Sequence, residues 1–238
     1  MWQFARTDEI IMEPKQIGDL AGRAAFVAIF GMLTTAKIFA IVSLLRMARI
    51  DWLELFTQVA NLAFVLLVLC MAIIRVKPLR GSEGWESRLS ALVGSFLPLL
   101  LLFLPFAEMG SAVRIVGLSL IALGWLLSAY VMLWLGRSFS VMPQARRLVT
   151  TGPYGIVRHP LYLAEEMAVL GVSILYLSPA AVAIVVVHWL FQLRRMGNEE
   201  KVLSATFPEY SAYSERTPKL IPCLFYKCKR GESLTAEK

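Results

Sequence analysis

Six apolar runs dominate this sequence and limit what the chain can fold into. They cover residues 24–45, 55–74, 89–107, 115–135, 161–177 and 180–193. Most are close to the roughly 20 residues with which a helix crosses the hydrocarbon core of a bilayer. The chain is also 58% hydrophobic, above the roughly 45–50% usual for soluble domains. We therefore predict an all-α, polytopic membrane protein with about six transmembrane helices.

The distribution of basic residues predicts the orientation of these helices. Residues 1–23, 75–88, 136–160 and 194–238 hold 20 of the 24 lysines and arginines. Six spans place these four segments on the same side of the membrane, and the positive-inside rule assigns that side to the cytoplasm. We therefore expect both termini in the cytoplasm. The first 23 residues carry acids and bases in place of an apolar stretch, so no cleavable signal is expected.

The polar interruptions divide the chain into four parts. We expect a polar segment at 1–23, four spans within 24–135, a core at 136–222 and a basic, flexible tail at 223–238. Pro98 and Pro105 predict a kink in the third span. Only Ser178 and Pro179 separate the last two apolar runs, which predicts a tight hairpin of two antiparallel helices.

Several kinds of chemistry are not supported by the sequence. Two histidines do not make a three-histidine metal site, and the chain has no H-E-x-x-H, G-x-S-x-G or P-loop motif. No two glycines are separated by a single residue, so the Rossmann fingerprint is missing. The net charge of +7 is better explained by topology and anionic lipid than by nucleic acid. We expect neither a bound metal nor a nucleic-acid partner.

The predicted hairpin brings two polar clusters together at the cytoplasmic boundary. His159, Tyr162, Glu165 and Glu166 open the fifth span, and a second cluster follows the sixth: Arg194, Arg195, Glu199 and Glu200. Each feature alone has an ordinary explanation, since arginines anchor helices at the membrane surface and acids favour helix N-termini. Their combination predicts a functional site. His188, deep in the sixth span, is more typical of a hydrogen-bonded core histidine.

Two stretches of this region resemble a known family. LVTTGPYGIVRHPLYLAEE is followed by RRMGNEEKVLSATFPEYSAYSERTPKLIP. Together they resemble the isoprenylcysteine carboxyl methyltransferase family, part of a wider group of membrane methyltransferases that includes phospholipid N-methyltransferases. The resemblance covers about residues 136–222. It implies an S-adenosyl-L-methionine-dependent methyltransferase without a Rossmann domain, acting on a lipidic or small hydrophobic acceptor in the bilayer.

The resemblance also assigns roles to residues. Arg195 would hold the substrate. The cofactor would be lined by residues of the loop before the hairpin, of the start of the fifth span and of the tail: Arg146, Arg147, Leu148, Val149, Tyr154, His159, Pro160, Leu161, Tyr162 and Glu199.

The residue types suit methyl transfer, but they leave the acceptor open. A carboxylate acceptor is already ionised at neutral pH and needs a fixed cation, which Arg195 offers. Glu165 and Glu166, which we also count as catalytic candidates, depart from the family pattern and favour an amine acceptor. A small thiol is the third possibility. The alternatives from other classes are a non-catalytic membrane scaffold or transporter and a sterol-reductase-like enzyme that uses a nicotinamide.

Overall fold

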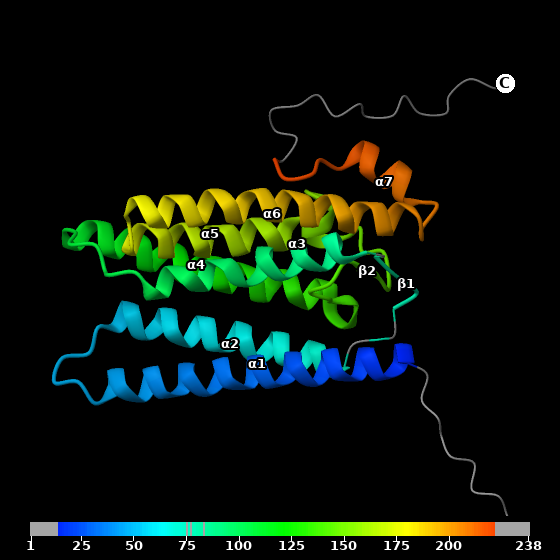
Figure 1. Cartoon of the computed structure of the whole chain (residues 1–238). Coiled ribbons are helices and arrows are strands. Elements are labelled where there is room, and N and C mark those ends of the chain that lie inside the picture. The colour runs from blue at the N-terminus through cyan, green and yellow to red at the C-terminus, as the bar shows by residue number, and fades with distance from the viewer. Residues whose placement is uncertain (1–13, 75, 77, 83, 222–238) are drawn as a thin grey trace, which may run out of the picture.

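The computed structural model describes residues 14–74, 76, 78–82 and 84–221, and side chains are described from residue 24 onward. This part of the chain forms a bundle of long helices with their axes roughly side by side (Figure 1). Residues 1–13 of the predicted polar segment and the whole predicted tail at 223–238 lie outside the described residues.

The elements alternate long helices with short connections. The bundle helices are α1 (Pro14–Leu45), α2 (Trp52–Ile74), α3 (Trp85–Phe96), α4 (Ser111–Leu135), α5 (Pro160–Leu175) and α6 (Pro179–Ser204), and the short α7 (Tyr210–Arg216) follows them. Three 3₁₀ segments and two strands complete the described chain: η1 (Leu97–Phe103), η2 (Gly136–Ser138), η3 (Gly152–Gly155), β1 (Arg80–Gly81) and β2 (Gln144–Ala145). The predicted all-α class is confirmed.

Among the described residues, five helical segments are long and apolar enough to cross a membrane. They are Ala24–Leu45, Trp52–Ile74, Trp85–Phe103, Ser111–Ser138 and Pro179–Ser204. The predicted fifth span corresponds to α5, which has only 16 residues. It nevertheless forms the expected hairpin with α6. In α6 the helix continues past the predicted end at residue 193 to Ser204, so Arg195 and Glu199 project from the same helix.

The predicted kink in the third span is a change of helix type. The α-helical part ends at Phe96, and η1 continues the segment in 3₁₀ geometry with Pro98 in its first turn. Proline lacks the N–H that an interior helical position would donate, so the ladder of α-helical hydrogen bonds is broken there.

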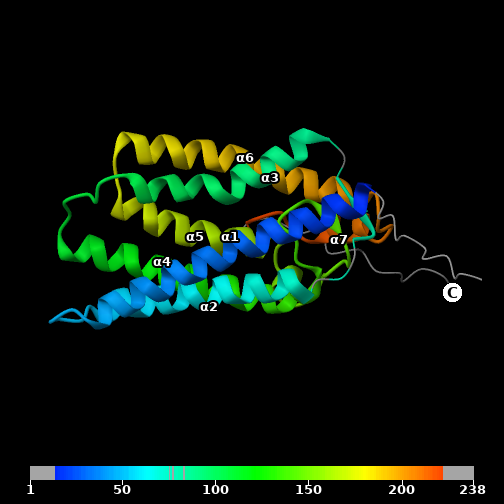
Figure 2. The ribbon, with the colours of Figure 1, turned by 60° about the horizontal axis from the view of Figure 1, so that its bottom comes forward.

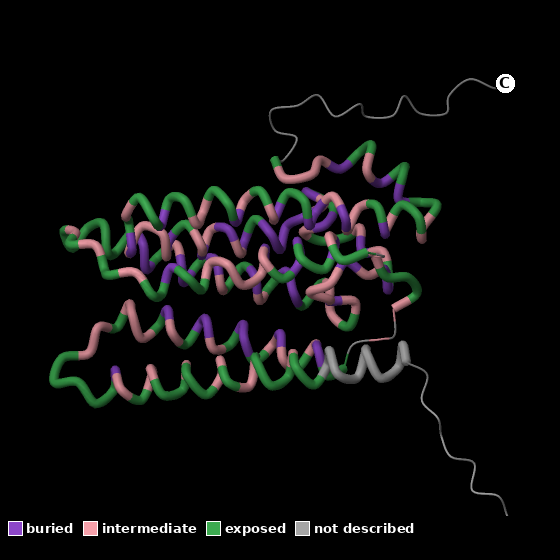
Figure 3. The backbone as a smooth tube through the Cα atoms, viewed as in Figure 1, coloured by how far each residue is buried: buried purple, intermediate pink, exposed green. Residues whose placement is uncertain are grey.

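The bundle is built from two helix pairs and a linking layer. Helix α2 packs against α1 and α4, α4 packs extensively against α5, and α3 packs against α6. Figure 2 shows α3 beside α6, and α1 crossing over α2. Buried positions concentrate on α4, α5 and α6 and on one face of α2, whereas α1 is mostly exposed (Figure 3). An exposed apolar surface of this kind suits a lipid environment.

Small residues bring α4 and α5 unusually close together. A Cβ atom built on Gly124 of α4 would lie 2.5 Å from the backbone nitrogen of Ala168, and one on Gly171 of α5 would lie 2.6 Å from the carbonyl oxygen of Gly117. Glycine and alanine at helix contacts let backbones approach within membranes, where the hydrophobic effect does not hold helices together. This contact fixes the start of α5 relative to α4.

We expect Gly124→Ala to destabilise the protein by about 1–3 kcal/mol, because the added methyl group meets backbone atoms that cannot rotate away. Thermal unfolding in detergent micelles measures the effect. Gly31→Ala is the matched control, since a Cβ atom there meets nothing within 4 Å and alanine favours a helix by about 0.5–1 kcal/mol over glycine. Equal stability changes in the two variants would show that the α4–α5 contact is not as close as described.

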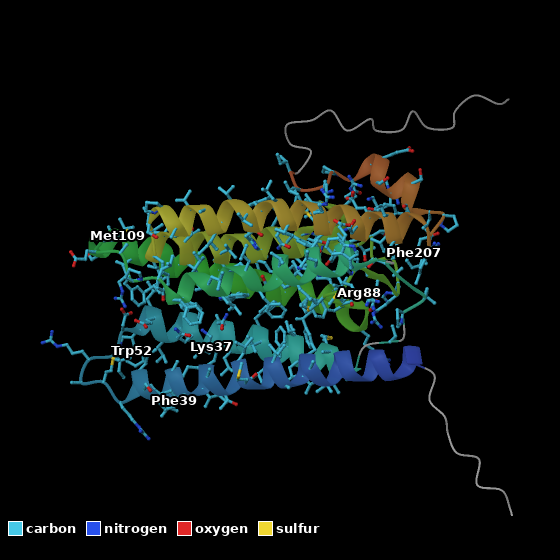
Figure 4. The ribbon with its side chains drawn as sticks, in the orientation of Figure 1. Lys37, Phe39, Trp52, Arg88, Met109 and Phe207 are labelled. Carbon is cyan, nitrogen blue, oxygen red and sulfur yellow. The ribbon has the colours of Figure 1, made fainter. Side chains whose placement is uncertain are left out.

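Polar contacts join α1 to α2 and tie this helix pair to α4. Lys37, which lies between α1 and α2 (Figure 4), donates to Oε1 of Gln58 at 3.1 Å, whereas Phe39 points away from the bundle. Asp51 caps α2 by accepting from the backbone N–H groups of Leu53 and Glu54. Arg114 of α4 pairs with both Asp51 and Glu54. The lysine inside the first span thus has a helix-to-helix structural contact.

Both ends of the described chain lie at the same end of the bundle. The start of α1, the β1–β2 pair and α7 all lie at the end opposite the α1–α2 and α5–α6 turns (Figure 1). The strands pair antiparallel, with Arg80 opposite Ala145 and Gly81 opposite Gln144. The loop that precedes α5 is therefore attached to the connection between α2 and α3.

Candidate functional site

The loop between α4 and α5 is held tightly against the bundle. Gly152 has a φ of +61°, and a Cβ atom there would lie 2.6 Å from the Trp134 ring, so this position requires glycine for two reasons. Gly152 is also the first residue of the 3₁₀ segment η3, which contains the buried Tyr154. Tyr154 packs in a cluster that includes Phe64, Met132 and Leu161.

His159 stands immediately before α5, whose first residue is Pro160. Proline at this position is favourable for starting a helix, because the first N–H has no partner within the helix. The His159 side chain is almost fully buried, and its Nε2 lies 2.9 Å from Oε1 of Glu200 on α6. The first predicted link between the two ends of the hairpin is therefore present in the structure.

The Glu200 carboxylate contacts three basic side chains: Arg158, His159 and Lys219. We call these four residues the Glu200 cluster. The Arg158 guanidinium lies 3.2 Å from Oε1 and the Lys219 ammonium 3.3 Å from Oε2. Two backbone bonds run alongside, from Arg158 N–H to Pro218 C=O and from His159 N–H to Lys219 C=O. The cluster and these bonds fasten the segment after α7 to the start of α5.

Tyr162 makes the second link across the hairpin. Its hydroxyl donates to Oε2 of Glu199 at 2.8 Å, and its ring lies under the Arg195 guanidinium, 5.0 Å from ring centre to Cζ. A cation over an aromatic face is attracted by the ring quadrupole. Because Arg195 and Glu199 are four residues apart, they lie on the same face of α6. Tyr162 therefore contacts two successive turns of α6, through Arg195 on one and Glu199 on the next.

A cleft lies beside Glu199 and the loop before α5. The space inside it that a water-sized molecule can reach is only about 50 Å³, below the roughly 300–1,000 Å³ common for small-molecule sites, so a cofactor-sized ligand would have to displace some of the side chains that line it. Seven of the ten predicted cofactor residues line it: Arg146, Arg147, Leu148, Val149, Tyr154, His159 and Glu199. Arg146 is buried and donates to Gln144 at 2.7 Å, whereas Arg147 is exposed. The other three, Pro160, Leu161 and Tyr162, do not line the cleft and are buried at the start of α5.

Two tyrosines of α7 complete the lining of the cleft. Tyr210 and Tyr213 of α7 both line it, and the Tyr213 hydroxyl donates to the carbonyl oxygen of Tyr154 at 2.7 Å. Burial raises the pKa of Tyr210 and of Tyr213 to about 12. Burial, followed by the charge of Glu199, also holds the pKa of Tyr154 well above its usual value. All three phenols remain protonated at neutral pH, so each remains a hydrogen-bond donor.

The predicted acidic pair divides between two environments. Glu166 is buried, and its Oε1 accepts from Nε2 of His188 at 2.7 Å and from Nε2 of Gln192 at 3.2 Å. Glu165 is only partly buried. His188 is thus the hydrogen-bonded core residue that the sequence suggested, and Glu166 faces the interior of the hairpin.

Arg194 and Arg195 also differ sharply. Arg194 is exposed and pairs with Glu86 of α3 at 2.8 Å. Arg195 is almost fully buried, and its Nη2 donates to the carbonyl oxygen of Val141 at 3.2 Å. A guanidinium removed from water at this depth requires compensation by close partners. Of the two, only Arg195 is placed as a site residue.

Sequence reasoning gave no site role to several residues that the structure brings to the cleft or beside it. Glu200 was grouped with the polar cluster only, and Tyr210 and Tyr213 were noted only as part of a shared pattern. Arg158 belongs to the stretch that resembles the family, without a role of its own, and Gln192 lies outside both stretches. Helical spacing alone identifies Gln192, which precedes Arg195 by three residues and therefore lies on the same face of α6.

Comparison with known proteins finds similarity over the part of the chain that contains α4 to α6. Residues 112–210 match the family model described as phospholipid methyltransferase. The protein-S-isoprenylcysteine O-methyltransferase B of Arabidopsis thaliana is 35% identical over 113 residues, which cover 44% of this chain and 57% of the relative. That of Schizosaccharomyces pombe is 32% identical over 116 residues, covering 45% of this chain and 48% of the relative. These similarities support the predicted resemblance to the membrane methyltransferases of the isoprenylcysteine and phospholipid families.

The chain is also similar to a protein whose name does not refer to methyl transfer. The cobalt-zinc-cadmium resistance protein CzcN of Cupriavidus metallidurans is 37% identical over 87 residues, which cover 36% of this chain and 39% of that protein. The chain thus spans roughly two fifths to three fifths of the length of these relatives. Within the part of the chain that the structure describes, no group of three histidine, cysteine or acidic side chains is arranged to hold a metal ion.

Proposed function

We propose that this protein is an integral membrane methyltransferase that uses S-adenosyl-L-methionine to methylate a lipidic or hydrophobic acceptor from the cytoplasmic side. The observation that carries the proposal is the arrangement around Tyr162. One helical turn of α6 presents Glu199 to the cleft, and the turn before it holds a buried arginine cation. A polar cofactor and an apolar acceptor with a charged end call for two such neighbouring groups.

The residues of the cleft suit the proposed cofactor. The cofactor supplies an activated methyl group on a positively charged sulfur, together with ribose hydroxyls, an adenine ring and an amino-acid end. The Glu199 carboxylate accepts hydrogen bonds from hydroxyl or ammonium groups, and the buried Arg146 is complementary to a carboxylate. Tyr154 offers an aromatic wall. These residues would hold the cofactor, and Arg147, Leu148, Val149 and His159 would complete the enclosure.

The buried Arg195 favours a carboxylate as the acceptor. A carboxylate is ionised at neutral pH, so the protein needs to orient it and exclude water rather than remove a proton. The planar guanidinium suits this task, and the Tyr162 ring restricts its movement. Glu165, half-buried one turn into α5, is the observation that favours an amine acceptor instead. Glu166 bonds His188 and Gln192 through Oε1 only, and its buried Oε2 has no hydrogen-bond partner among the described residues, so these bonds do not exclude Glu166 as a second group for an amine.

Cofactor binding is the first test of this proposal. We expect S-adenosylhomocysteine to bind the purified protein in calorimetric titration, and we expect His159→Ala and Glu199→Ala to weaken binding about ten-fold or more, the usual result of removing a hydrogen bond to a charged group. Glu215→Ala is the matched control, because this carboxylate is exposed on α7. A nicotinamide dinucleotide should not compete.

Two outcomes would contradict the proposal. No binding of S-adenosylhomocysteine would favour a scaffold or transporter. Competition by a nicotinamide dinucleotide would favour a reductase.

A further inference from the structure

A row of buried polar side chains extends from Arg195 into the interior of the hairpin. It consists of Glu166 from α5 and of His188, Gln192 and Arg195 from α6, each more than nine-tenths buried. None of these four lines the cleft. Buried polar groups cost free energy unless they are hydrogen-bonded to each other, so their contacts indicate what the row does.

Gln192 stands between two groups of opposite charge. Its Nε2 donates to Oε1 of Glu166 at 3.2 Å, and its Oε1 accepts from Nη1 of Arg195 at 3.4 Å. A carboxylate only accepts hydrogen bonds here, and a guanidinium only donates them. The amide therefore has a single orientation that satisfies both neighbours. His188 fixes the same carboxylate oxygen from the other side.

Helix α3 holds this amide in place. A Cβ atom on Gly94 would lie 2.8 Å from Oε1 of Gln192 and 3.7 Å from Cδ of Arg195. The amide oxygen thus lies close to the backbone of α3, where a Cβ atom would displace the end of the Gln192 side chain. Three helices define the position of one side chain: α5 through Glu166, α3 through Gly94 and α6 by carrying it.

We propose that Gln192 is a positioning residue for Arg195. As a neutral spacer, it keeps the guanidinium away from Glu166 and holds it over Tyr162, where its remaining donors face the acceptor. The charges of Glu165 and Glu199 act on the guanidinium where it stands. Without the spacer, a direct ion pair with Glu166 would compete with them and withdraw the guanidinium from Tyr162. The inference rests on the proposed function insofar as Arg195 orients the acceptor.

The activity test separates acceptor binding from cofactor binding. We expect Gln192→Leu to raise the acceptor KM about ten-fold while the affinity for S-adenosylhomocysteine changes by less than about two-fold. Gly94→Ala should act in the same direction, because it displaces the amide without removing it. Gly197→Ala is the matched control on α6, where a Cβ atom meets nothing within 4 Å, and it should leave KM unchanged.

A second substitution tests the reason for the effect. If Glu166 captures Arg195 when the spacer is lost, Glu166→Gln in the Gln192→Leu background should restore part of the acceptor KM. A merely structural role for Gln192 predicts that the second buried change adds further damage. Additive losses, or equal losses of acceptor and cofactor binding in Gln192→Leu, would overturn the proposal.

A stability measurement makes the contact testable without activity. In a double-mutant cycle on thermal unfolding, Gln192→Leu and Arg195→Lys should be non-additive, as expected for side chains in contact. Additivity would refute the link between Gln192 and Arg195 even in a protein with full methyltransferase activity. If the wild type neither binds S-adenosylhomocysteine nor transfers a methyl group, the proposed function is refuted, and the acceptor-positioning role of Gln192 is refuted with it. A non-additive cycle would then show only a structural contact between Gln192 and Arg195.

Discussion

Replacing Arg195 with alanine is expected to reduce methyl transfer by about a hundred- to a thousand-fold or more, the usual scale for removing a fixed charge from a preorganised site. The guanidinium is almost fully buried, bonded to Val141 C=O and stacked over Tyr162, so solvent does not replace it. Transfer of a labelled methyl group from S-adenosyl-L-methionine to a prenylated cysteine analogue measures the loss. Arg195→Lys should retain only part of the activity, because an ammonium lacks the planar fork.

The cofactor affinity of the same variant decides how the loss is interpreted. We expect S-adenosylhomocysteine to bind Arg195→Ala nearly as well as the wild type, because Arg195 does not line the cleft. Arg194→Ala is the matched control, since Arg194 is exposed and pairs with Glu86 on the surface, where such pairs are worth little. Equal losses of turnover and of cofactor affinity would move Arg195 into the cofactor site.

The choice of acceptor uses the same assay. Methyl transfer to the prenylated cysteine analogue supports the carboxylate, and transfer to the amine headgroup of a phospholipid supports the amine. A carboxylate acceptor should lose its activity in Arg195→Ala. An amine acceptor that loses activity in Glu165→Gln instead would overturn the carboxylate proposal and assign the orienting role to Glu165.

The sequence predicted the architecture because membrane helices depend mainly on local composition. Every apolar run is longer than an ordinary loop. In lipid its backbone N–H and C=O groups must bond to each other, so each run forms a helix whatever the rest of the chain does. The hairpin followed from Ser178 and Pro179, which leave no room for another connection. From the hairpin alone, His159 and Tyr162 were expected near Glu199 and Glu200, and the contacts confirm this proximity.

Three features depended on packing between helices and were not predictable from local pattern. The close approach of α4 and α5 requires Gly124 to lie against Ala168, and neither residue reveals its partner in the sequence. The β1–β2 pair joins segments more than 60 residues apart. Glu165 and Glu166 are neighbours in sequence, but successive helical residues point about 100° apart, so they enter different surroundings. Side-chain direction, rather than residue type, separated their environments.

The Glu200 cluster leads to the second large expected effect. Glu200→Ala should lower the affinity for S-adenosylhomocysteine about a hundred-fold, because it leaves Arg158, His159 and Lys219 without the carboxylate they share. Removing one partner of a largely buried ion pair typically costs about 3–5 kcal/mol. The consequence reaches the cofactor cleft because the segment after α7 is fastened to the start of α5 at this point, and Tyr210 and Tyr213 enter the cleft from α7.

Calorimetry of the Glu200→Ala variant measures the loss of affinity. Hydrogen exchange of residues 210–219 shows whether the cause is release of α7 and the segment after it. Faster exchange in this segment should accompany the weaker binding, because the backbone bonds to Pro218 and Lys219 lose their neighbouring side-chain contacts. Glu209→Ala controls for removing an exposed carboxylate next to α7. Weak binding with unchanged exchange would show instead that Glu200 acts on the cofactor through His159, which lines the cleft itself.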